Sequence, residues 1–186
     1  MLVGLSGLKG SGKDTCADYL VKTHGFVKVA FADPLKAALK VLFMFTDDQL
    51  NGTIEQKESP DNRWFGCSTR TAMQFVGTEL LREQLDKIMP GLGKNYFVTY
   101  LEMWFKAELE KNPNLKVVVS DVRFLNEADC IKKISGSIIK INRHSTHTDQ
   151  HQSETELAQI KSDFVLDNNE SIDILYANID TILEKI

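Results

Sequence analysis

The chain has 186 residues, with 22 Lys and Arg against 26 Asp and Glu and a formal net charge of −4. The length indicates one domain, and a composition that is 42% hydrophobic and 26% charged argues against disorder or a collagen-like repeat. The acidic balance argues against a surface for a nucleic-acid polymer or a polybasic membrane anchor, but leaves room for a small basic pocket. The cysteines, Cys16, Cys67 and Cys130, form no CxxC pair, so they favour a cytoplasmic protein over a disulfide framework.

The first third of the chain predicts two strands and two helices. Residues 2–6 are apolar and broken by glycine, with no basic stretch ahead of them, which favours a buried strand over a signal peptide. A helix over 12–24 and a strand over 26–31 follow. Asp33 is predicted to cap the next helix, with Pro34 in its first helical position. No apolar run reaches the ~18 residues that a membrane span needs.

The middle of the chain begins with an irregular stretch. Residues 46–68 are rich in Asp, Asn, Gly and Ser and predict a long surface excursion, which in compact domains is often functional. Helical spacing of apolar residues predicts helices over 69–87 and 95–111. The β-branched run 115–119 predicts a strand that is covered on both faces, and a charged helix over 125–134 follows.

The last third predicts the remaining elements of the sheet. We expect a strand over 137–141, a polar loop over 142–152, a short capped helix over 153–160, a strand over 164–166 and a closing amphipathic helix over 172–186. Strands that alternate with helices imply an α/β fold, here a five-stranded parallel sheet flanked by helices.

A glycine-rich loop lies between the first predicted strand and the first predicted helix. Residues 7–15 read GLKGSGKDT and satisfy GxxxxGK through Gly7, Gly12 and Lys13. Glycines let backbone amides surround phosphate oxygens, the helix N-terminus adds a favourable dipole, and Lys13 reaches the outer phosphates. The motif predicts a P-loop for ATP or GTP, against the alternative of a glycine-rich turn that happens to carry a lysine.

The loop departs from the usual pattern at one position. Asp14 stands where a Ser or Thr normally follows the lysine, and Thr15 comes next. The usual hydroxyl binds Mg²⁺, whereas a carboxylate there holds the ion directly or through water and leaves Thr15 for an inner phosphate.

A second candidate site follows the strand over residues 115–119. The segment VVVSDVR ends in Asp121, with Arg123 two residues beyond. In P-loop proteins an acid at the end of a neighbouring strand holds Mg²⁺ or its waters, and an arginine at that edge neutralises a phosphate. The alternative is an aspartate that caps the next helix.

Polar side chains also recur in the predicted helix over 69–87. Arg70, Gln74 and Thr78 follow at i, i+4 and i+8, so an α-helix would place them on nearly one face, where they would converge on a phosphate and a base edge. A solvated helix face is the alternative. Gly77 costs roughly 1 kcal/mol against alanine in a helix, which indicates a close approach by a ligand or another backbone.

Several segments together resemble one family. GSGKDT, FADPLK, RTAMQFVGTELLR, SDVRFLNEA and HQSETEL followed by DFVLDNNESIDIL appear in the order found in the deoxynucleoside monophosphate kinases of tailed phages. The resemblance implies a P-loop NTPase fold over residues 1–186, with a helical monophosphate-binding insertion (46–112) and a short lid (142–153). It also implies transfer of the γ-phosphoryl group of ATP to a dNMP, location in the host cytoplasm and the option of a homodimer.

The resemblance assigns roles to individual residues. The ATP phosphate loop would be Gly10, Ser11, Gly12, Lys13, Asp14 and Thr15. The monophosphate would lie among Asp33, Lys36, Arg63, Arg70, Gln74, Thr78, Glu79, Arg82 and Glu127. The catalytic group would be Lys13, Asp121, Arg123 and Arg143, with Mg²⁺ held by Asp14 and Asp121.

The lid hypothesis rests on Arg143, which follows the fourth strand. We expect it to stack on adenine or to contact a phosphate, against the alternative of a solvated loop arginine. His144, His147 and His151 match no well-defined metal site, so we predict none there. Two other functions stay open: a P-loop kinase for another acceptor, such as dephospho-coenzyme A, a nucleoside or a sugar acid, and a nucleotide-gated regulatory protein.

Overall fold

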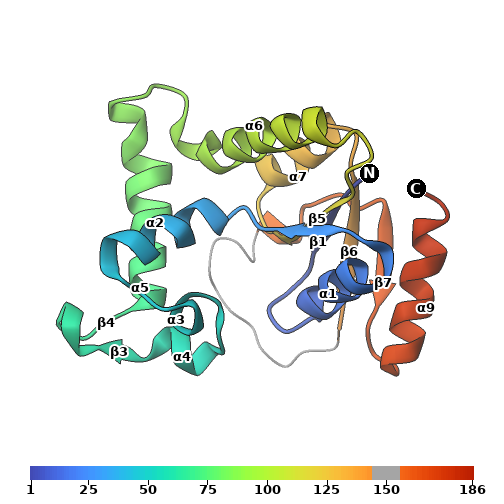
Figure 1. The fold of residues 1–186 in the computed structure, drawn as a ribbon, viewed down its shortest axis with the longest axis horizontal. Helices are drawn as coiled ribbons and strands as arrows, with labels where there is room; N and C mark the ends of the chain where they lie inside the picture. The colour runs from blue at the N-terminus through green and yellow to red at the C-terminus, as the bar shows by residue number, and fades with distance from the viewer. Residues whose placement is uncertain (144–155) are drawn as a thin grey trace. The chain divides into compact units, whose positions relative to one another are not determined.

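The computed structural model describes residues 1–143 and 156–186. The chain forms two compact units: the first is Met1–Phe31 with Leu101–Ile186, and the second is Ala32–Tyr100. Their helices and strands are labelled in Figure 1. The second unit begins and ends earlier than the insertion expected over 46–112. The substrate-binding role of that insertion stays a prediction.

The first unit is built on a five-stranded sheet in the order β2-β5-β1-β6-β7, with every neighbouring pair parallel. This confirms the predicted parallel sheet. The strands are β1 (Leu2–Ser6), β2 (Val27–Val29), β5 (Val117–Val122), β6 (Ser137–Asn142) and β7 (Phe164–Asp167). Its helices are α1 (Lys13–His24), α7 (Leu125–Lys133) and α9 (Ile172–Leu183), while α6 (Tyr96–Lys111) leads into it from the second unit.

Both faces of β1 are covered by helices, which explains its uninterrupted apolar sequence. Val3 and Leu5 belong to a core shared with α1 and α9, in which Cys16 of α1 is buried. Residues alternate between the faces of a strand, so Gly4 points to the other side, where Ile131 of α7 packs close to its backbone. Figure 1 shows α1 and α9 together on one side of the sheet and α7 on the other.

The second unit begins with a series of short elements. They are α2 (Asp33–Phe43), α3 (Asp47–Asn51), α4 (Ile54–Glu58), the antiparallel pair β3 (Pro60–Asp61) and β4 (Cys67–Ser68), and α5 (Thr69–Gln74). Thr46 and Thr53 each start a capping box, with Gln49 and Gln56 as the reciprocal partners. Side-chain capping therefore gives the predicted polar excursion a regular backbone.

The prediction that Asp33 caps α2 is wrong. The N-cap is Ala32, the helix already includes Asp33, and Pro34 lies within the first turn. Proline suits the first turn because its fixed φ is helical and the missing N–H has no intrahelical partner there. Asp33 instead contributes a negative charge to the positive end of the helix, 3.9 Å from Lys36 Nζ.

The single α-helix predicted over residues 69–87 is also wrong. The α-helix ends at Gln74 and continues as a π-helix, Phe75–Gln84, followed by a 3₁₀ turn, Leu85–Lys87. The apolar spacing over ten residues does not distinguish i+4 from i+5 hydrogen bonding. The group that lies close to Gly77 is the side chain of Leu35, not another backbone, since a Cβ at Gly77 would lie 2.8 Å from Leu35 Cδ2.

Some predictions fall outside the described residues: the three histidines, most of the lid over 142–153 and the start of the helix at residue 153. Within the part of the chain that the structure describes, no helix combines the length and the apolar character that crossing a membrane needs.

Candidate active site

The phosphate loop lies where the motif predicts it, between the end of β1 and the start of α1. Gly7 has a φ of +147°, and a Cβ there would meet the Ile141 carbonyl and the Ser11 hydroxyl. A side chain at position 7 would thus be strained and obstructed at once. Among the described residues, neither the buried Ser11 hydroxyl nor that of Ser6, where β1 ends, has a hydrogen-bond partner. These are polar groups that an oxygen-rich ligand can satisfy.

Lys13 folds back over its own loop. Its Nζ donates to the carbonyl oxygens of Gly7, at 2.6 Å, and Leu8, at 2.8 Å, and the residue is only 9% exposed. The ammonium group is therefore held inside the glycine-rich loop by main-chain oxygens. This arrangement keeps a positive charge where a bound phosphate would need it.

Asp14 points to a neighbouring strand. Its Oδ1 accepts a hydrogen bond from Lys28 Nζ of β2 at 2.9 Å, and Lys28 also donates to Asp18 at 3.0 Å. Burial acts to lower the pKa of Lys28, but the two carboxylates outweigh it and raise that pKa. The sequence analysis missed Lys28, because nothing in the phosphate-loop motif indicates that Asp14 lies beside β2.

Asp121 lies on β5, directly beside β1. Val122 of β5 pairs with Ser6, the last residue of β1, so Asp121 reaches the same sheet edge as the phosphate loop. Its Oδ1 accepts the main-chain N–H of Phe31 at 2.7 Å. The predicted neighbourhood of strand-end acid and P-loop strand is therefore present, and Arg123 is exposed one residue beyond β5.

Glu127 is buried beside the turn that leads from β5 into α7. It is 2% exposed, and its Oε2 accepts the main-chain N–H groups of Arg123, at 2.9 Å, and Phe124, at 3.2 Å. The carboxylate thus fixes the turn from β5 into α7, which carries Arg123. Its predicted role at the substrate stays untested, and its geometry indicates support for that turn.

A cavity of about 620 Å³ adjoins the phosphate loop. Gly7 and Leu8 of the phosphate loop form one part of its lining. The lining also includes Arg143, directly after β6, Asp167 at the end of β7, and Asn169 in the turn that follows. The volume is in the usual range for small-molecule sites. Arg143, the predicted lid residue, therefore borders a space that also contacts the P-loop.

The second unit carries the remaining predicted residues. Arg70 Nε lies 3.0 Å from Glu58 Oε1, and the Arg82 guanidinium lies 5.0 Å from the centre of the Phe97 ring. Gln74 and Glu79 are exposed and Thr78 is half-buried. Because i+5 bonding begins at Phe75, four residues there make slightly less than a turn instead of slightly more, so Thr78 stays close to the face of Gln74.

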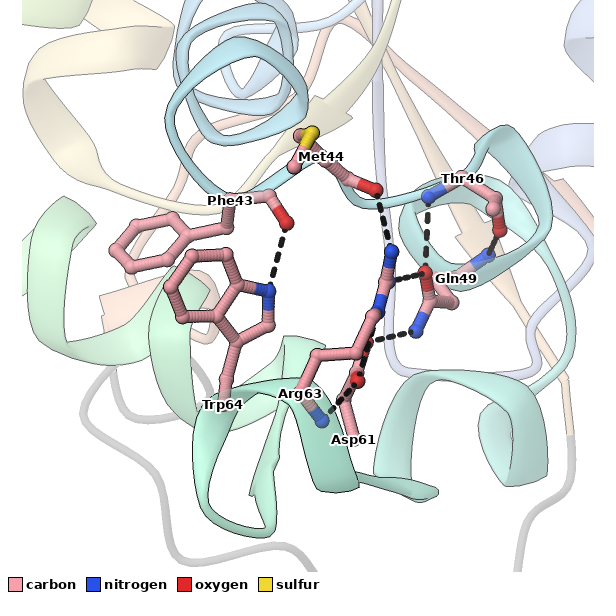
Figure 2. Close-up of polar contacts among 7 residues, drawn as sticks. All are labelled: Phe43, Met44, Thr46, Gln49, Asp61, Arg63 and Trp64. Carbon is pink, nitrogen blue, oxygen red and sulfur yellow. Dashed lines mark hydrogen bonds and ion pairs between the residues drawn. The ribbon is translucent and has the colours of Figure 1, made fainter.

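Arg63 is engaged by its own hairpin, as Figure 2 shows. Its Nε and Nη2 donate to the two oxygens of Asp61 at 3.0 and 2.6 Å, and Gln49 Nε2 donates to the same carboxylate at 2.9 Å. These hydrogen bonds, Arg63 first and Gln49 second, hold the pKa of Asp61 well below its usual range. An anion would meet this carboxylate and Asp48 in the adjoining cavity of about 490 Å³. The arrangement suits a structural ion pair better than a phosphate site.

One contact to the phosphate loop was missed altogether. The Asn168 side chain donates from Nδ2 to the Ser11 carbonyl at 2.8 Å. The sequence did contain a signal for this contact. Asn168 and Asn169 directly follow a short strand, and polar residues at the carboxyl ends of parallel strands meet at one edge of the sheet, which is why Asp121 was predicted.

Comparison with known proteins places these observations in a family. The model of a family described as deoxynucleotide monophosphate kinase matches residues 1–61 and 48–179. A putative deoxynucleotide monophosphate kinase of Acanthamoeba polyphaga mimivirus is 54% identical over 96% of this chain and 94% of its own length. The deoxynucleotide monophosphate kinase of Escherichia phage RB69 is 24% identical over 98% of this chain and 99% of its own length.

The fold agrees with that assignment. A dephospho-CoA kinase from Campylobacter jejuni has a TM-score of 0.51 and 12% identity over 99% of this chain and 96% of its own, a likeness that concerns the fold alone. With the P-loop, the strand-end acid and the parallel sheet in the expected places, the motif resemblance is confirmed: the chain belongs to the deoxynucleotide monophosphate kinase family.

Proposed function

We propose that the first unit binds ATP through the loop Gly7–Thr15 and that the chain transfers its γ-phosphoryl group to the 5′-phosphate of a deoxynucleoside monophosphate. ATP is the donor and a dNMP the acceptor, in line with the family. Lys13 would exchange its bonds to the Gly7 and Leu8 carbonyls for the outer phosphates. The products are ADP and a dNDP.

The observation that supports this proposal most is the pairing of β1 with β5. Parallel strands bring their carboxyl ends to one edge of the sheet, and the Ser6–Val122 register sets Asp121 beside the start of the phosphate loop. A cation from the loop and an acid from the adjacent strand are the two charges that phosphoryl transfer from a nucleoside triphosphate requires.

The oxygen donors at this edge fit Mg²⁺. Asp121 supplies a carboxylate at the strand end and Asp14 another in the first turn of α1, which leaves the Thr15 hydroxyl for an inner phosphate; Mg²⁺ prefers one or two carboxylates together with water and phosphate oxygens. Asp14 would first have to release Lys28. When bound, the ion would neutralise charge on the outer phosphates.

The reaction needs no general base from the protein. A phosphate monoester has its second pKa near 6, so the acceptor is already largely ionised near pH 7. The chain's contribution is to orient the two phosphates and neutralise their charge, with Arg123 as the cation at the sheet edge. Glu127 would hold the Arg123 main chain for that purpose.

For the acceptor we propose residues of the second unit. Arg70 is the leading candidate, because Glu58, which pairs with its guanidinium in the described part of the chain, is itself half exposed and easily exchanged for a phosphate. Asp33, Lys36, Gln74, Thr78, Glu79 and Arg82 remain candidates for the nucleoside or the phosphate. Arg63 would have to leave Asp61 to take part.

The cavity beside the P-loop is the proposed place of the ATP base. Arg143 lies at its border, where its planar guanidinium would stack on adenine, and Asp167 and Asn169 offer hydrogen-bond partners. A homodimer, the absence of a nucleic-acid or membrane partner and a cytoplasmic location stay predictions.

The decisive experiment measures ADP release from ATP with dAMP, dCMP, dGMP and dTMP and with the matching ribonucleotides as acceptors. We expect release that depends on at least one dNMP, and a fall of about 100-fold or more in Lys13→Ala at an unchanged melting temperature. Lys22→Ala, at an exposed lysine in the last turn of α1, is the matched control.

Two results would overturn the proposal. Phosphoryl transfer only to dephospho-coenzyme A, a nucleoside or a sugar acid would make the chain a kinase for another acceptor. ATP binding with slow hydrolysis and no response to any dNMP would make it a nucleotide-gated protein.

A further inference from the structure

Asn168 occupies a fixed position at the end of the sheet. It directly follows β7, and its main-chain N–H donates to the carbonyl of Asn142, the last residue of β6, at 2.7 Å. The residue before it, Asp167, pairs with Asn142 in the parallel register. The backbone that carries the Asn168 side chain is therefore anchored to two strands.

The Asn168 side chain reaches from there to the phosphate loop, where its Nδ2 donates to the carbonyl of Ser11 at 2.8 Å. Gly12, the next residue, has a φ of +103°, and a Cβ there would clash with Asn168 Nδ2. The amide of Asn168 thus lies directly against the Ser11–Gly12 peptide, at a distance that only glycine allows.

Holding one end of a peptide group orients the other end. In a planar trans peptide the C=O and the N–H point in opposite directions, so fixing the Ser11 carbonyl on Asn168 directs the Gly12 N–H away from it. Backbone N–H groups of this loop are the donors that surround a triphosphate. The orientation of one such donor is consequently set by a residue that follows it by more than 150 positions in the sequence.

We propose that Asn168 is a positioning residue for the triphosphate loop, tying the Ser11–Gly12 peptide to the ends of β6 and β7. This inference rests on the proposed function in that the loop binds the phosphates of ATP. A neutral amide suits the task, because it donates a hydrogen bond without adding negative charge near the phosphates. A carboxylate of the same shape would face the Ser11 carbonyl as a second acceptor and repel the triphosphate.

The test uses Asn168→Asp, which keeps the shape and reverses the hydrogen-bond chemistry, and Asn168→Ala, which removes the side chain. We expect the KM for ATP to rise about 3- to 10-fold in Asn168→Ala and further in Asn168→Asp, with the KM for the dNMP unchanged. Asn178→Ala, an exposed asparagine on α9, is the matched control and should behave as wild type.

Binding of adenosine separates this role from a contact to the base. Asn169, the next residue, lines the cavity beside the loop, so a base-binding role would weaken adenosine and ATP alike. Loop positioning weakens ATP and leaves adenosine unchanged. Equal losses for both ligands, or wild-type ATP affinity in Asn168→Asp, would overturn the inference, as would a lowered melting temperature with unchanged KM values. Absence of ATP binding in the wild type would instead contradict the proposed function.

Discussion

The Asp61 carboxylate accepts four hydrogen bonds from two residues, Arg63 and Gln49. They come from the Arg63 main chain at 3.0 Å, from Arg63 Nε and Nη2, and from Gln49 Nε2. The side chain is 6% exposed. Each of these bonds favours the ionised form, and together they hold the pKa of Asp61 below its ordinary value.

This shift predicts how stability depends on pH. A lowered folded pKa stabilises the fold fully above the unfolded value, about 3.9, and that contribution is lost as the pH falls through the folded pKa. Asp61→Asn should therefore be less stable than wild type at pH 7, with the difference shrinking below about pH 4. Urea midpoints measured between pH 3 and 7 test this.

The control for the pH experiment is Asp129→Asn, at an exposed carboxylate of α7. It should leave the pH dependence of the midpoint as in wild type. A difference between Asp61→Asn and wild type that stays constant down to pH 3 would show that the carboxylate charge is not what stabilises the hairpin.

At the scale of elements, the β3–β4 hairpin is tied to the end of α2. Trp64 Nε1 donates to the Phe43 carbonyl at 2.7 Å, and the indole ring meets the Phe43 ring edge to face at 5.3 Å between centroids. Both contacts are visible in Figure 2. Phe65, the next residue, is fully exposed. Two adjacent aromatic residues thus differ in what they contribute.

Trp64→Phe should lower the free energy of unfolding by about 1 kcal/mol, because it keeps an aromatic ring but leaves the Phe43 carbonyl without its donor. Phe65→Ala should change it by less than about 0.5 kcal/mol, since it removes no packed surface. Urea unfolding followed by far-UV circular dichroism measures both. Equal effects of the two substitutions would contradict the assigned hydrogen bond.

The elements also show what a sequence pattern can and cannot predict. The five strands were predictable because short apolar, β-branched runs between glycines and polar turns are typical of buried strands. The P-loop was predictable because phosphate binding requires glycines and a lysine at a fixed spacing. The π-helix after Gln74 was not, since apolar spacing barely differs between i+4 and i+5 bonding. The Asp33 cap failed because proline is tolerated throughout the first turn.

Site residues divide in a similar way. Lys13 and Asp121 follow from local motifs, and the structure places Asp121 on β5, the strand paired with β1, from which the loop to Lys13 continues. The individual partners of Lys28 and Asn168 could not be predicted, because they contact Asp14 and Ser11 only once the sheet order has brought their strands beside the phosphate loop. The family resemblance implies that Glu127 contacts the substrate, whereas in the structure its carboxylate is buried and accepts a main-chain N–H of the turn between β5 and α7.

At the scale of the whole molecule, the chain divides its predicted residues between two compact units. The phosphate loop, Asp121, Arg123 and Arg143 belong to the first, and Arg70 with its neighbours belongs to the second. If the first unit binds the donor and the second the acceptor, each ligand alone should stabilise a different part of the chain.

Hydrogen exchange measured by mass spectrometry tests this division. A non-hydrolysable ATP analogue should slow exchange in residues 7–14 and 140–143, and a dNMP alone should slow it in residues 58–82. The Lys13→Ala variant should lose the response to the ATP analogue, and the Arg70→Ala variant should lose the response to the dNMP. Protection of residues 7–14 by the dNMP alone, without change in 58–82, would contradict the acceptor assignment.

Cys16 lies on α1 three residues after Lys13, with its side chain in the core shared by α1 and α9. Burial raises the pKa of its thiol to about 12, so at neutral pH it is almost entirely protonated. Oxidants and alkylating reagents act on thiolates, and this one is neither ionised nor accessible. The sulfur behind the phosphate loop is therefore protected by the core, and we expect alkylation of Cys16 to require unfolding of the first unit.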